Sequence, residues 1–255
     1  MIEPNKSLGQ HWLADKNVLQ QIVDAANITP EDEVVEIGPG TGTLTRALID
    51  NGAHVTAVEF DRNLVDRLQA EFPEARVVRS DILSFDLSRM KTPYKIVANI
   101  PYYLTSKLIR LLSESANPPE RAVLLIQKEV AQRVAAAPGD MSLLGVSAQY
   151  YWEVSLGIEV PAKLFTPPPK VDSQVVILNK RQQPPFGKID EKKFFRIVKA
   201  GFSNRRKTLL NSLSAGLHLS KENTRQPLEN AGIKPSSRAQ ELSLEQWHTL
   251  YKNFA

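Results

Sequence analysis

One glycine-rich stretch constrains the fold of this chain more than any other, residues 34–45 with the sequence VVEIGPGTGTLT. It begins with an apolar run, interrupted by a single acid, that is typical of a strand buried on both faces. Gly38, Gly40 and Gly42 follow at alternate positions, where glycine permits positive φ angles and lets backbone N–H groups approach a ligand. Apolar residues at helical spacing resume at Leu44. The stretch therefore predicts a strand, a tight turn and a helix in direct succession.

Two acidic residues narrow the kind of ligand that this turn would hold. A glycine turn alone is compatible with any α/β protein. Glu36, two residues before Gly38, suits a cationic ligand, whereas it would repel a pyrophosphate group. Glu59 ends a second apolar run 21 positions after Gly38, where an acid is placed to accept hydrogen bonds from ribose hydroxyls. Together the two acids favour an adenosine ligand with a positive centre, namely S-adenosylmethionine.

The alternation of apolar runs and helical spacing continues along the chain. Three further strands are expected, at residues 75–78, 94–98 and 123–126. This order predicts a doubly wound α/β sheet, whose ligands lie beyond the carboxyl ends of the strands. Asp81 and Asn99 each follow one of these strands, so we expect both in the crevice that Gly38 and Glu59 form. For Asp81 a helix cap is an equally good interpretation.

The segment Asn-Ile-Pro-Tyr, residues 99–102, is the most informative tetrapeptide of the chain. Pro101 fixes a turn that presents a side-chain amide and an aromatic ring at the mouth of the crevice. The exocyclic amine of adenine is a poor nucleophile, and the oxygen of Asn99, with a nearby backbone carbonyl, can accept its hydrogen bonds and orient it. Tyr102 would stack on a base flipped out of its helix. The alternative is an ordinary turn with a packed tyrosine.

Two other segments are candidates for the same site. Residues 6–13, KSLGQHWL, combine polar and large apolar side chains, as expected of a segment folded over a ligand or of a docked arm. Phe165 precedes three consecutive prolines, which stiffen the loop, and is a candidate second stacking face with Lys163 and Lys170 near phosphates. Burial of Phe165 in the core is the alternative.

Charge is distributed unevenly along the chain. Residues 1–180 carry 18 Lys and Arg against 22 Asp and Glu, whereas residues 181–255 carry 14 against 6. The net charges of −4 and +8 indicate a polyanionic partner for the last third, with a solvated basic face as the alternative. Residues 181–187 are expected to form a linker, and the pattern after them predicts helices. The densest basic cluster of this last third is Arg205, Arg206 and Lys207, with Lys199 nearby. We expect this cluster at the start of a helix and predict that it contacts RNA phosphates.

Several classes of chemistry are excluded by composition. The chain has no cysteine, which excludes disulfides, thiolate metal sites and a cysteine nucleophile. Its four histidines are scattered without metal-binding spacing, so no metal is expected. An apolar run of membrane-spanning length and a signal peptide are both missing. A cytoplasmic monomer with no membrane contact is the expectation.

The motifs closely resemble those of the KsgA-type small-subunit (16S) rRNA adenine N6,N6-dimethyltransferases over nearly the whole chain. The resemblance rests on LGQHWL at 8–13, VEIGPGTG at 35–42, VEFD at 58–61, SD at 80–81, NIPY at 99–102, QKEV at 127–130, FTPPPKVDS at 165–173 and FSNRRKT at 202–208. It implies a Rossmann-like, class I methyltransferase domain over residues 1–180 and a helical, basic rRNA-binding domain over residues 181–255. The implied activity is transfer of two methyl groups to each of two adjacent adenosines in the hairpin near the 3′ end of 16S rRNA, late in ribosome biogenesis.

The same resemblance implies roles for individual residues. The S-adenosylmethionine site would be lined by His11, Leu13, Gly38, Glu59, Asp81 and Asn99. Glu59 would hold the ribose and Asp81 the adenine amino group of the cofactor, while Asn99 and Tyr102 orient the target adenine and Phe165 stacks on it. The chain departs from the family at His11, often Asn, and at Trp12, often Phe.

Two rival functions are compatible with parts of this pattern. The Erm type, which methylates an adenine of 23S rRNA, shares the Asn-Ile-Pro-Tyr and Pro-Lys-Val stretches. The form of the triple-proline and Arg-Arg-Lys segments favours the small-subunit enzyme. A non-catalytic RNA-binding or transcription-assisting relative is the second rival, and the presence of Glu59, Asp81, Asn99 and Tyr102 argues against it.

Overall fold

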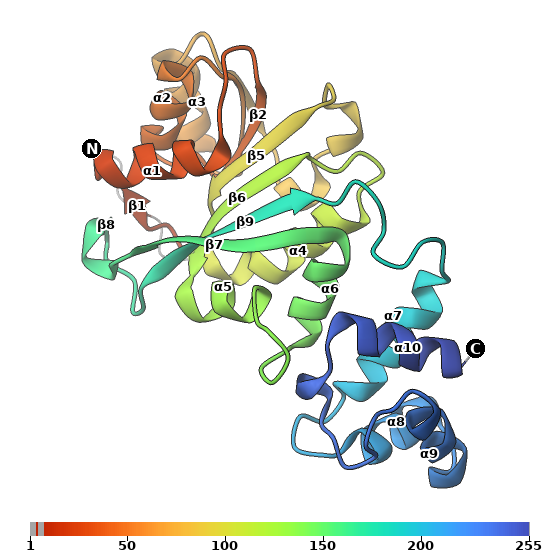
Figure 1. The fold of residues 1–255 in the computed structure, drawn as a ribbon. Coiled ribbons are helices and arrows are strands. Elements are labelled where there is room, and N and C mark those ends of the chain that lie inside the picture. Colours follow the sequence, from red (N-terminus) through yellow and green to blue (C-terminus); the bar gives the residue numbers. More distant parts are fainter. Residues whose placement is uncertain (1–3, 5–7, 255) are drawn as a thin grey trace. The chain divides into compact units, whose positions relative to one another are not determined.

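The computed structural model of the chain describes residues 4 and 8–254 (Figure 1). Contacts between residues divide the chain into two compact units. The first comprises Met1–Gln132 and Trp152–Lys180, and the second comprises Arg133–Tyr151 and Arg181–Ala255. Each unit has its own hydrophobic core.

A seven-stranded sheet forms the centre of the first unit, with the strand order β4-β3-β2-β5-β6-β9-β7. Its strands are β2 (Glu33–Ile37), β3 (His54–Glu59), β4 (Arg76–Arg79), β5 (Tyr94–Asn99), β6 (Arg121–Gln127), β7 (Trp152–Val160) and β9 (Ser173–Lys180). The first five strands of that order are parallel, and β9 and β7 run antiparallel to their neighbours. The chain leaves β2 in one direction for β3 and β4, then crosses back to β5 on the other side. This reversal confirms the predicted doubly wound sheet and places a switch point between β2 and β5.

Helices cover this sheet (Figure 1). They are α1 (Lys16–Ala26), α2 (Thr43–Asp50), α3 (Arg62–Glu71), α4 (Thr105–Glu114) and α5 (Lys128–Val134), with short 3₁₀ turns η2 (Ile82–Ser84), η3 (Leu87–Arg89), η4 (Tyr102–Leu104) and η5 (Ala162–Leu164). A two-stranded pair, β1 (Trp12–Leu13) with β8 (Phe165–Thr166), completes the unit. In the described part of the chain no helix has both the length and the apolar composition that crossing a bilayer requires.

The first helix shows how local sequence and the sheet fit together. Asp15 caps α1 by accepting a hydrogen bond from the backbone N–H of Val18, and Asn27 ends it in the left-handed conformation. The buried ammonium of Lys95, on β5, donates to the carbonyl of Asn27 and to Asp32, at 2.7 Å each. Because a buried charge is tolerated only with such partners, Lys95 ties the end of α1 to the sheet.

The glycine turn connects β2 to α2 as the sequence predicts. Gly38, Gly40 and Gly42 all have positive φ angles, of 65°, 59° and 83°. At Gly42 a Cβ would overlap the ring of Phe72, which belongs to a small buried cluster with Leu64 and Leu68. Glycine is therefore required there both by the backbone conformation and by the close approach of α3.

The second unit is a small helical assembly. Its elements are α6 (Leu143–Tyr151), α7 (Glu191–Gly201), α8 (Leu209–Leu217), α9 (Lys221–Asn230), η6 (Ala239–Glu241) and α10 (Leu244–Asn253). They share one core that includes Phe194, Leu213 and Trp247. The described residues of the last third of the chain contain helices α7 to α10, as predicted, with turns between them.

Two predictions about this unit need correction. The expected domain boundary at residue 180 assigns residues 133–151 to the sheet domain. Val146 and Tyr150 of α6 are instead buried in the helical core, where the Tyr150 ring lies 5.3 Å from that of Phe194. Helical periodicity in a sequence does not determine which of two cores a helix such as α6 joins. The second correction concerns Arg205, Arg206 and Lys207, which lie in the turn between α7 and α8 rather than on a helix start, because α8 begins only after the cap at Thr208.

The clash at Gly42 yields a prediction about stability. We expect Gly42→Ala to lower the free energy of unfolding by about 2–4 kcal/mol, since it adds overpacking against Phe72 to the strain of a left-handed alanine. Gly38→Ala is the matched control: it has a similar φ, but a Cβ there meets no atom within 4 Å, so only about 1 kcal/mol of strain is expected. Urea denaturation followed by circular dichroism measures both. Equal destabilisation by the two variants would contradict the packing argument.

Candidate functional site

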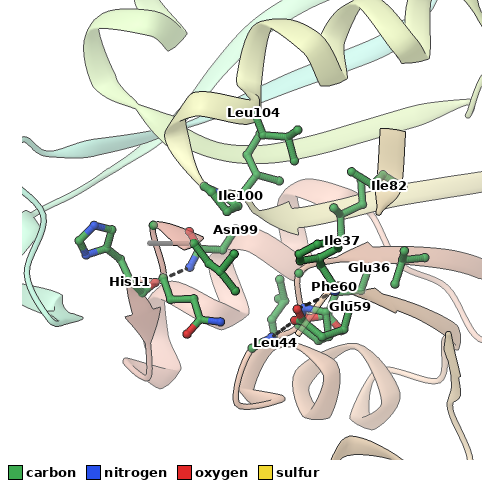
Figure 2. A pocket seen from close by; sticks show the side chains of 18 of the residues that line it. His11, Glu36, Ile37, Leu44, Glu59, Phe60, Ile82, Asn99, Ile100 and Leu104 are labelled. Atoms are coloured by element: carbon green, nitrogen blue, oxygen red, sulfur yellow. Dashed lines mark hydrogen bonds between the residues drawn. The ribbon is translucent and has the colours of Figure 1, made fainter. Parts of the chain in front are cut away.

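A pocket lies in the first unit beyond the carboxyl ends of β2, β3 and β5 (Figure 2). Its cavity of about 270 Å³ is lined by the glycine turn, by residues 8–13 and by the segment 99–104. Among the described residues that line it are six of the predicted site positions, namely His11, Leu13, Gly38, Glu59, Asp81 and Asn99, together with Tyr102. The parallel strands thus bring these positions together at one edge of the sheet, as expected from the topology.

Glu59 is held at the end of β3 by backbone hydrogen bonds. One carboxylate oxygen accepts from the N–H groups of Phe60 and Asp61, both at 2.8 Å, and the other accepts from the N–H of Gly40 at 3.2 Å. Burial raises the pKa of Glu59, and these three bonds oppose that rise. The carboxylate links the glycine turn to β3, and its oxygens retain lone pairs that can accept from a ligand hydroxyl.

Gly38 leaves room on the pocket side of the turn. Its N–H donates to the carbonyl of Val58 at 3.0 Å, which fixes the backbone, and a Cβ at this position would meet no protein atom within 4 Å. A ligand can therefore approach the backbone of the turn directly. At Gly40, by contrast, a Cβ would lie 3.1 Å from Cδ1 of Trp12, so the indole already closes that side.

Glu36 differs from the expectation of a charged contact. Its side chain is buried and accepts a hydrogen bond from the Thr45 hydroxyl at 2.6 Å, which links β2 to α2. Burial raises the pKa of Glu36 to about 8; the Thr45 hydrogen bond opposes this shift and the nearby Glu59 carboxylate reinforces it. At neutral pH the group is therefore mostly neutral. The sequence pattern could not reveal this, because the shift depends on desolvation by the folded core.

Residues 8–13 form a strap across the pocket. The backbone carbonyl of His11 accepts a hydrogen bond from the Asn99 amide at 3.0 Å, as Figure 2 shows. The carbonyl of Leu13 accepts from the Thr43 hydroxyl at 2.7 Å, and the His11 ring nitrogen Nδ1 lies 2.7 Å from the carbonyl of Pro167. The strap is thus anchored to β5, to the start of α2 and to the proline loop. The described part of this segment is docked and also lines the pocket, which is compatible with both sequence interpretations. Residues 6 and 7 lie outside the described residues.

The hydrogen bond to the strap also sets the orientation of Asn99. Because Nδ2 donates to the His11 carbonyl, Oδ1 remains as an acceptor, and no donor bonds to it among the residues that the structure describes. The ring of Tyr102 stacks against that of His11 with centroids 6.0 Å apart and an angle of 23° between planes. Its hydroxyl lies 2.9 Å from Oγ of Ser173, and burial raises the pKa of Tyr102. The amide and the phenol are therefore both held in place.

Asp81 lies at the other end of the pocket. Its carboxylate caps the 3₁₀ turn η2 by accepting from the backbone N–H of Leu83 at 2.9 Å. The side chain is nevertheless exposed and lines the pocket. The cap interpretation is thus correct, and it leaves the carboxylate available to a ligand.

Phe165 is not where a stacking residue would be. Its side chain is only 3% exposed and packs in the core, and its backbone pairs with that of Leu13 between β8 and β1. The alternative interpretation, burial, is the one that the structure supports. Lys163 and Lys170 are exposed on the flanking loop and do not line the pocket.

Three aromatic residues of the pocket were given no individual role from the sequence, although Trp12 belongs to the candidate segment 6–13. Phe60 and Tyr103 are 61% and 64% exposed at its wall. Trp12 lines it too, and its indole N–H is buried with no hydrogen-bond partner among the described residues. One feature of the sequence could have identified them, because each directly follows a predicted site residue. Phe60 follows Glu59, Tyr103 follows Tyr102 and Trp12 follows His11.

The second unit carries the predicted basic cluster by itself. Arg205, Arg206 and Lys207 are exposed in one turn, and Lys199 is exposed on α7. Including residues 133–151 adds one arginine and one aspartate and leaves the net charge of the unit at +8.

Across residues 4 and 8–254, no three His, Asp or Glu side chains are grouped so that they could hold a metal ion.

A doubly wound sheet with a glycine turn after its first parallel strand and an acid at the end of the next is typical of Rossmann-like nucleotide-binding domains. The similarity to solved rRNA methyltransferase structures places this fold among the class I S-adenosylmethionine-dependent methyltransferases. The model of the family described as ribosomal RNA adenine dimethylase matches residues 1–255. The chain belongs to this family. It is therefore an rRNA methyltransferase, and S-adenosylmethionine is its cofactor.

Individual relatives agree with this assignment. Two proteins named ribosomal RNA small subunit methyltransferase A are similar: that of Dehalococcoides mccartyi strain CBDB1 is 42% identical, covering 100% of this chain and 89% of the relative, and that of Alkaliphilus metalliredigens is 41% identical, covering 98% and 92%. Among solved structures, a dimethyladenosine transferase from Plasmodium falciparum has a TM-score of 0.78 at 26% identity, covering 94% and 96% of the two chains. The 23S rRNA methyltransferase ErmE has a TM-score of 0.77 at 28% identity, covering 95% and 98%.

The residues present fit this cofactor. Gly38 leaves open space against the backbone of the turn, the buried indole N–H of Trp12 lacks a partner within the described residues, and Glu59 offers acceptor lone pairs. A nucleoside with a polar, charged tail has groups that match all three. The apolar side chains of Ile82 and Ile100 complete the wall.

The raised pKa of Glu36 predicts how stability depends on pH. Its folded-state pKa of about 8 lies above the ordinary value of 4.5, so its contribution to stability is fully present below pH 4.5 and is lost as the pH rises through 8. This loss is on the order of 5 kcal/mol over that range. Glu36→Gln removes it, so the wild type should lose stability relative to this variant between pH 5 and pH 8.5. Urea denaturation of both proteins at several pH values measures the difference, and a constant difference would contradict the assignment.

Proposed function

We propose that this chain dimethylates N6 of two adjacent adenosines in the hairpin near the 3′ end of small-subunit rRNA. The observation that carries this proposal is the arrangement of Asn99 and Tyr102 at the pocket. The amide oxygen of Asn99 accepts from no donor within residues 4 and 8–254, and the aromatic ring of Tyr102 is anchored. The curated relatives named for the small subunit support the choice of rRNA. We further propose that the protein is a cytoplasmic monomer acting late in ribosome biogenesis, for which the absence of cysteine is compatible with a reducing compartment.

In this proposal, residues that line the pocket would bind the ribose, the adenine and the amino-acid end of the cofactor. Glu59 would hold the ribose of the cofactor by accepting a hydrogen bond from it, and Asp81 would accept one from the adenine amino group. Phe60 and Ile82 provide apolar walls for the adenine ring. His11, Leu13 and Gly38 line the part of the pocket next to Asn99, where the amino-acid end would lie.

S-adenosylmethionine, when bound, supplies an electrophilic methyl group on a positively charged sulfur. The protein contributes position and electrostatics. Oδ1 of Asn99 accepts a hydrogen bond from the adenine N6 amine, which turns the nitrogen lone pair toward the methyl group and stabilises the positive charge that develops on nitrogen. The His11 carbonyl holds the amide in this orientation, since it accepts the Nδ2 hydrogen bond.

We assign stacking on the target adenine to Tyr102. Its hydroxyl contact with Ser173 restricts the ring, and it lines the pocket. Phe165, the other candidate, is buried between β1 and the core. Exposing a buried phenylalanine costs about 2–3 kcal/mol, so a role for Phe165 would require the β1–β8 pair to open when RNA binds.

In the second unit, Lys199, Arg205, Arg206 and Lys207 are proposed to bind RNA phosphates, and Lys163 and Lys170 are proposed to do so in the first. All six side chains are exposed. Lysine and arginine on an exposed turn neutralise phosphates without reading sequence. Base specificity would then come from the pocket.

The Erm type remains the second candidate because ErmE has a closely similar fold. Methyl transfer from labelled S-adenosylmethionine to undermethylated small subunits and, separately, to 23S rRNA distinguishes the two. We expect labelled N6,N6-dimethyladenosine in small-subunit rRNA alone. Label only in 23S rRNA would assign the protein to the Erm type, and no label in either would refute the proposal.

Asn99→Ala tests the role of the amide. We expect kcat to fall by about 10²–10³-fold, while the Kd for S-adenosylmethionine changes by no more than about threefold. Asn51→Ala is the matched control, since it deletes an amide that donates to the Ala47 carbonyl at the end of α2, outside the pocket. Single-turnover kinetics and calorimetric titration measure the two quantities. A loss confined to cofactor affinity would show that Asn99 does not act on the adenine.

The basic turn is tested by the salt dependence of RNA binding. Replacing Arg205, Arg206 and Lys207 by glutamine should reduce the slope of log K against log salt by about 2–3, close to one per lost phosphate contact. Glutamine at the scattered, exposed Lys221, Lys234 and Lys252 changes the net charge equally and serves as the control. If both variants alter the slope to the same extent, net charge rather than the turn is responsible.

A further inference from the structure

One exposed aromatic residue at the pocket has no role in the function described above. Tyr103 is 64% exposed, and the residues on either side of it point elsewhere: Tyr102 is anchored to Ser173 and Leu104 is buried. Burying apolar surface stabilises a protein or complex by roughly 25 cal/mol for each Å², and an exposed aromatic ring lacks this stabilisation. A large ring left in water at the edge of a binding pocket therefore suggests a contact that forms only when a ligand is present.

The backbone around Tyr103 is fixed, although its ring is open to solvent. Tyr103 is the central residue of η4, in which the N–H of Leu104 donates to the Pro101 carbonyl at 3.0 Å. The Thr105 hydroxyl donates to the Tyr102 carbonyl at 3.1 Å and continues the turn into α4. On one side the strap packs against the ring, because a Cβ at Gly9 would lie 3.6 Å from its Cε1 atom. The rest of the ring faces solvent from a preorganised position.

A cation accompanies this ring on the same wall of the pocket. Lys107 follows Tyr103 by four residues, in the first turn of α4, and also lines the pocket. The 3₁₀ turn that holds Tyr103 leads directly into α4, and both side chains line the same pocket. Lys107 is exposed and forms no ion pair with any residue that the structure describes, and the first turn of α4 contains no acid. The wall therefore presents one flat ring and one unneutralised positive charge.

We propose that Tyr103 and Lys107 form a second nucleotide subsite, in which Tyr103 stacks on the base next to the target adenosine and Lys107 contacts its phosphate. This inference rests on the proposed function and specifies how the same pocket holds its RNA. A base in the pocket has left its own stack, so its neighbour loses a stacking partner, and an aromatic ring beside the pocket replaces it. Charge complementarity favours a nucleotide, since the ring matches a base and the ammonium matches a phosphate.

The subsite has a consequence for two adjacent targets. Stacking on an aromatic ring tolerates any base because every base has a π face. Methyl groups on N6 leave that face in place. Tyr103 can therefore hold the neighbouring adenosine both before and after its own methylation, which keeps the strand in register while the other adenosine occupies the pocket.

The test uses an rRNA hairpin with 2-aminopurine in place of the adenosine beside the target, because stacking quenches its fluorescence. We expect the wild type and Tyr103→Phe to quench it on binding, and Tyr103→Ala to quench it much less. RNA affinity should fall by about 5–100-fold in Tyr103→Ala, and the Kd for S-adenosylmethionine should not change. Lys107→Gln should keep the quenching and reduce the salt slope by about 1. Leu156→Ala, a deletion at another exposed apolar side chain of the same unit, is the matched control and should resemble the wild type.

Three results would overturn the subsite: no quenching by the wild type, quenching by Tyr103→Ala equal to that of the wild type, or an effect of Tyr103→Ala on cofactor affinity alone. Failure of the proposed function is recognised separately by methyl transfer. If the wild type methylates small-subunit rRNA and quenching is independent of Tyr103, only the subsite is wrong. If the wild type transfers no methyl group to this RNA, the proposed function itself is wrong.

Discussion

The three backbone hydrogen bonds to the Glu59 carboxylate are the interaction on which the site depends. They join the turn after β2 to the end of β3 through a single side chain. The turn can approach β3 this closely because Gly38 and Gly40 adopt positive φ angles. The carboxylate held in this way also lines the pocket, so the bonds that stabilise the fold also shape the site.

Two buried acids next to the same turn have different chemistry. Glu36 has one hydroxyl as partner, and burial raises its pKa to about 8. Glu59 is also buried, but three N–H donors oppose the rise in its pKa. Hydrogen bonds to the charged form therefore distinguish the two buried acids, and they favour Glu59 for the acceptor role proposed above. Glu36 serves instead as a neutral link between β2 and α2.

The strap of residues 8–13 contacts both residues that are proposed to act on the target adenine, Asn99 and Tyr102. Its His11 carbonyl orients Asn99, and its His11 ring stacks on Tyr102. Through β1 the same segment pairs with β8 and keeps Phe165 in the core. A change in the strap on binding RNA would thus alter the amide, the stacking ring and the proline loop together. This coupling is a property of long-range contacts that join residues more than 80 positions apart.

The sheet, the glycine turn and the strand-end positions of Glu59, Asp81 and Asn99 could be predicted from the sequence, because strand periodicity, turn chemistry and strand-end placement are local properties. The helical, basic last third could be predicted in the same way. Four other features became clear only from the folded structure: α6 joins the second core, Phe165 is buried, Glu36 is mostly neutral and Tyr103 is exposed. Each of these depends on which distant surface covers a side chain, and burial of that kind is set by packing between elements rather than by neighbouring residues in the chain.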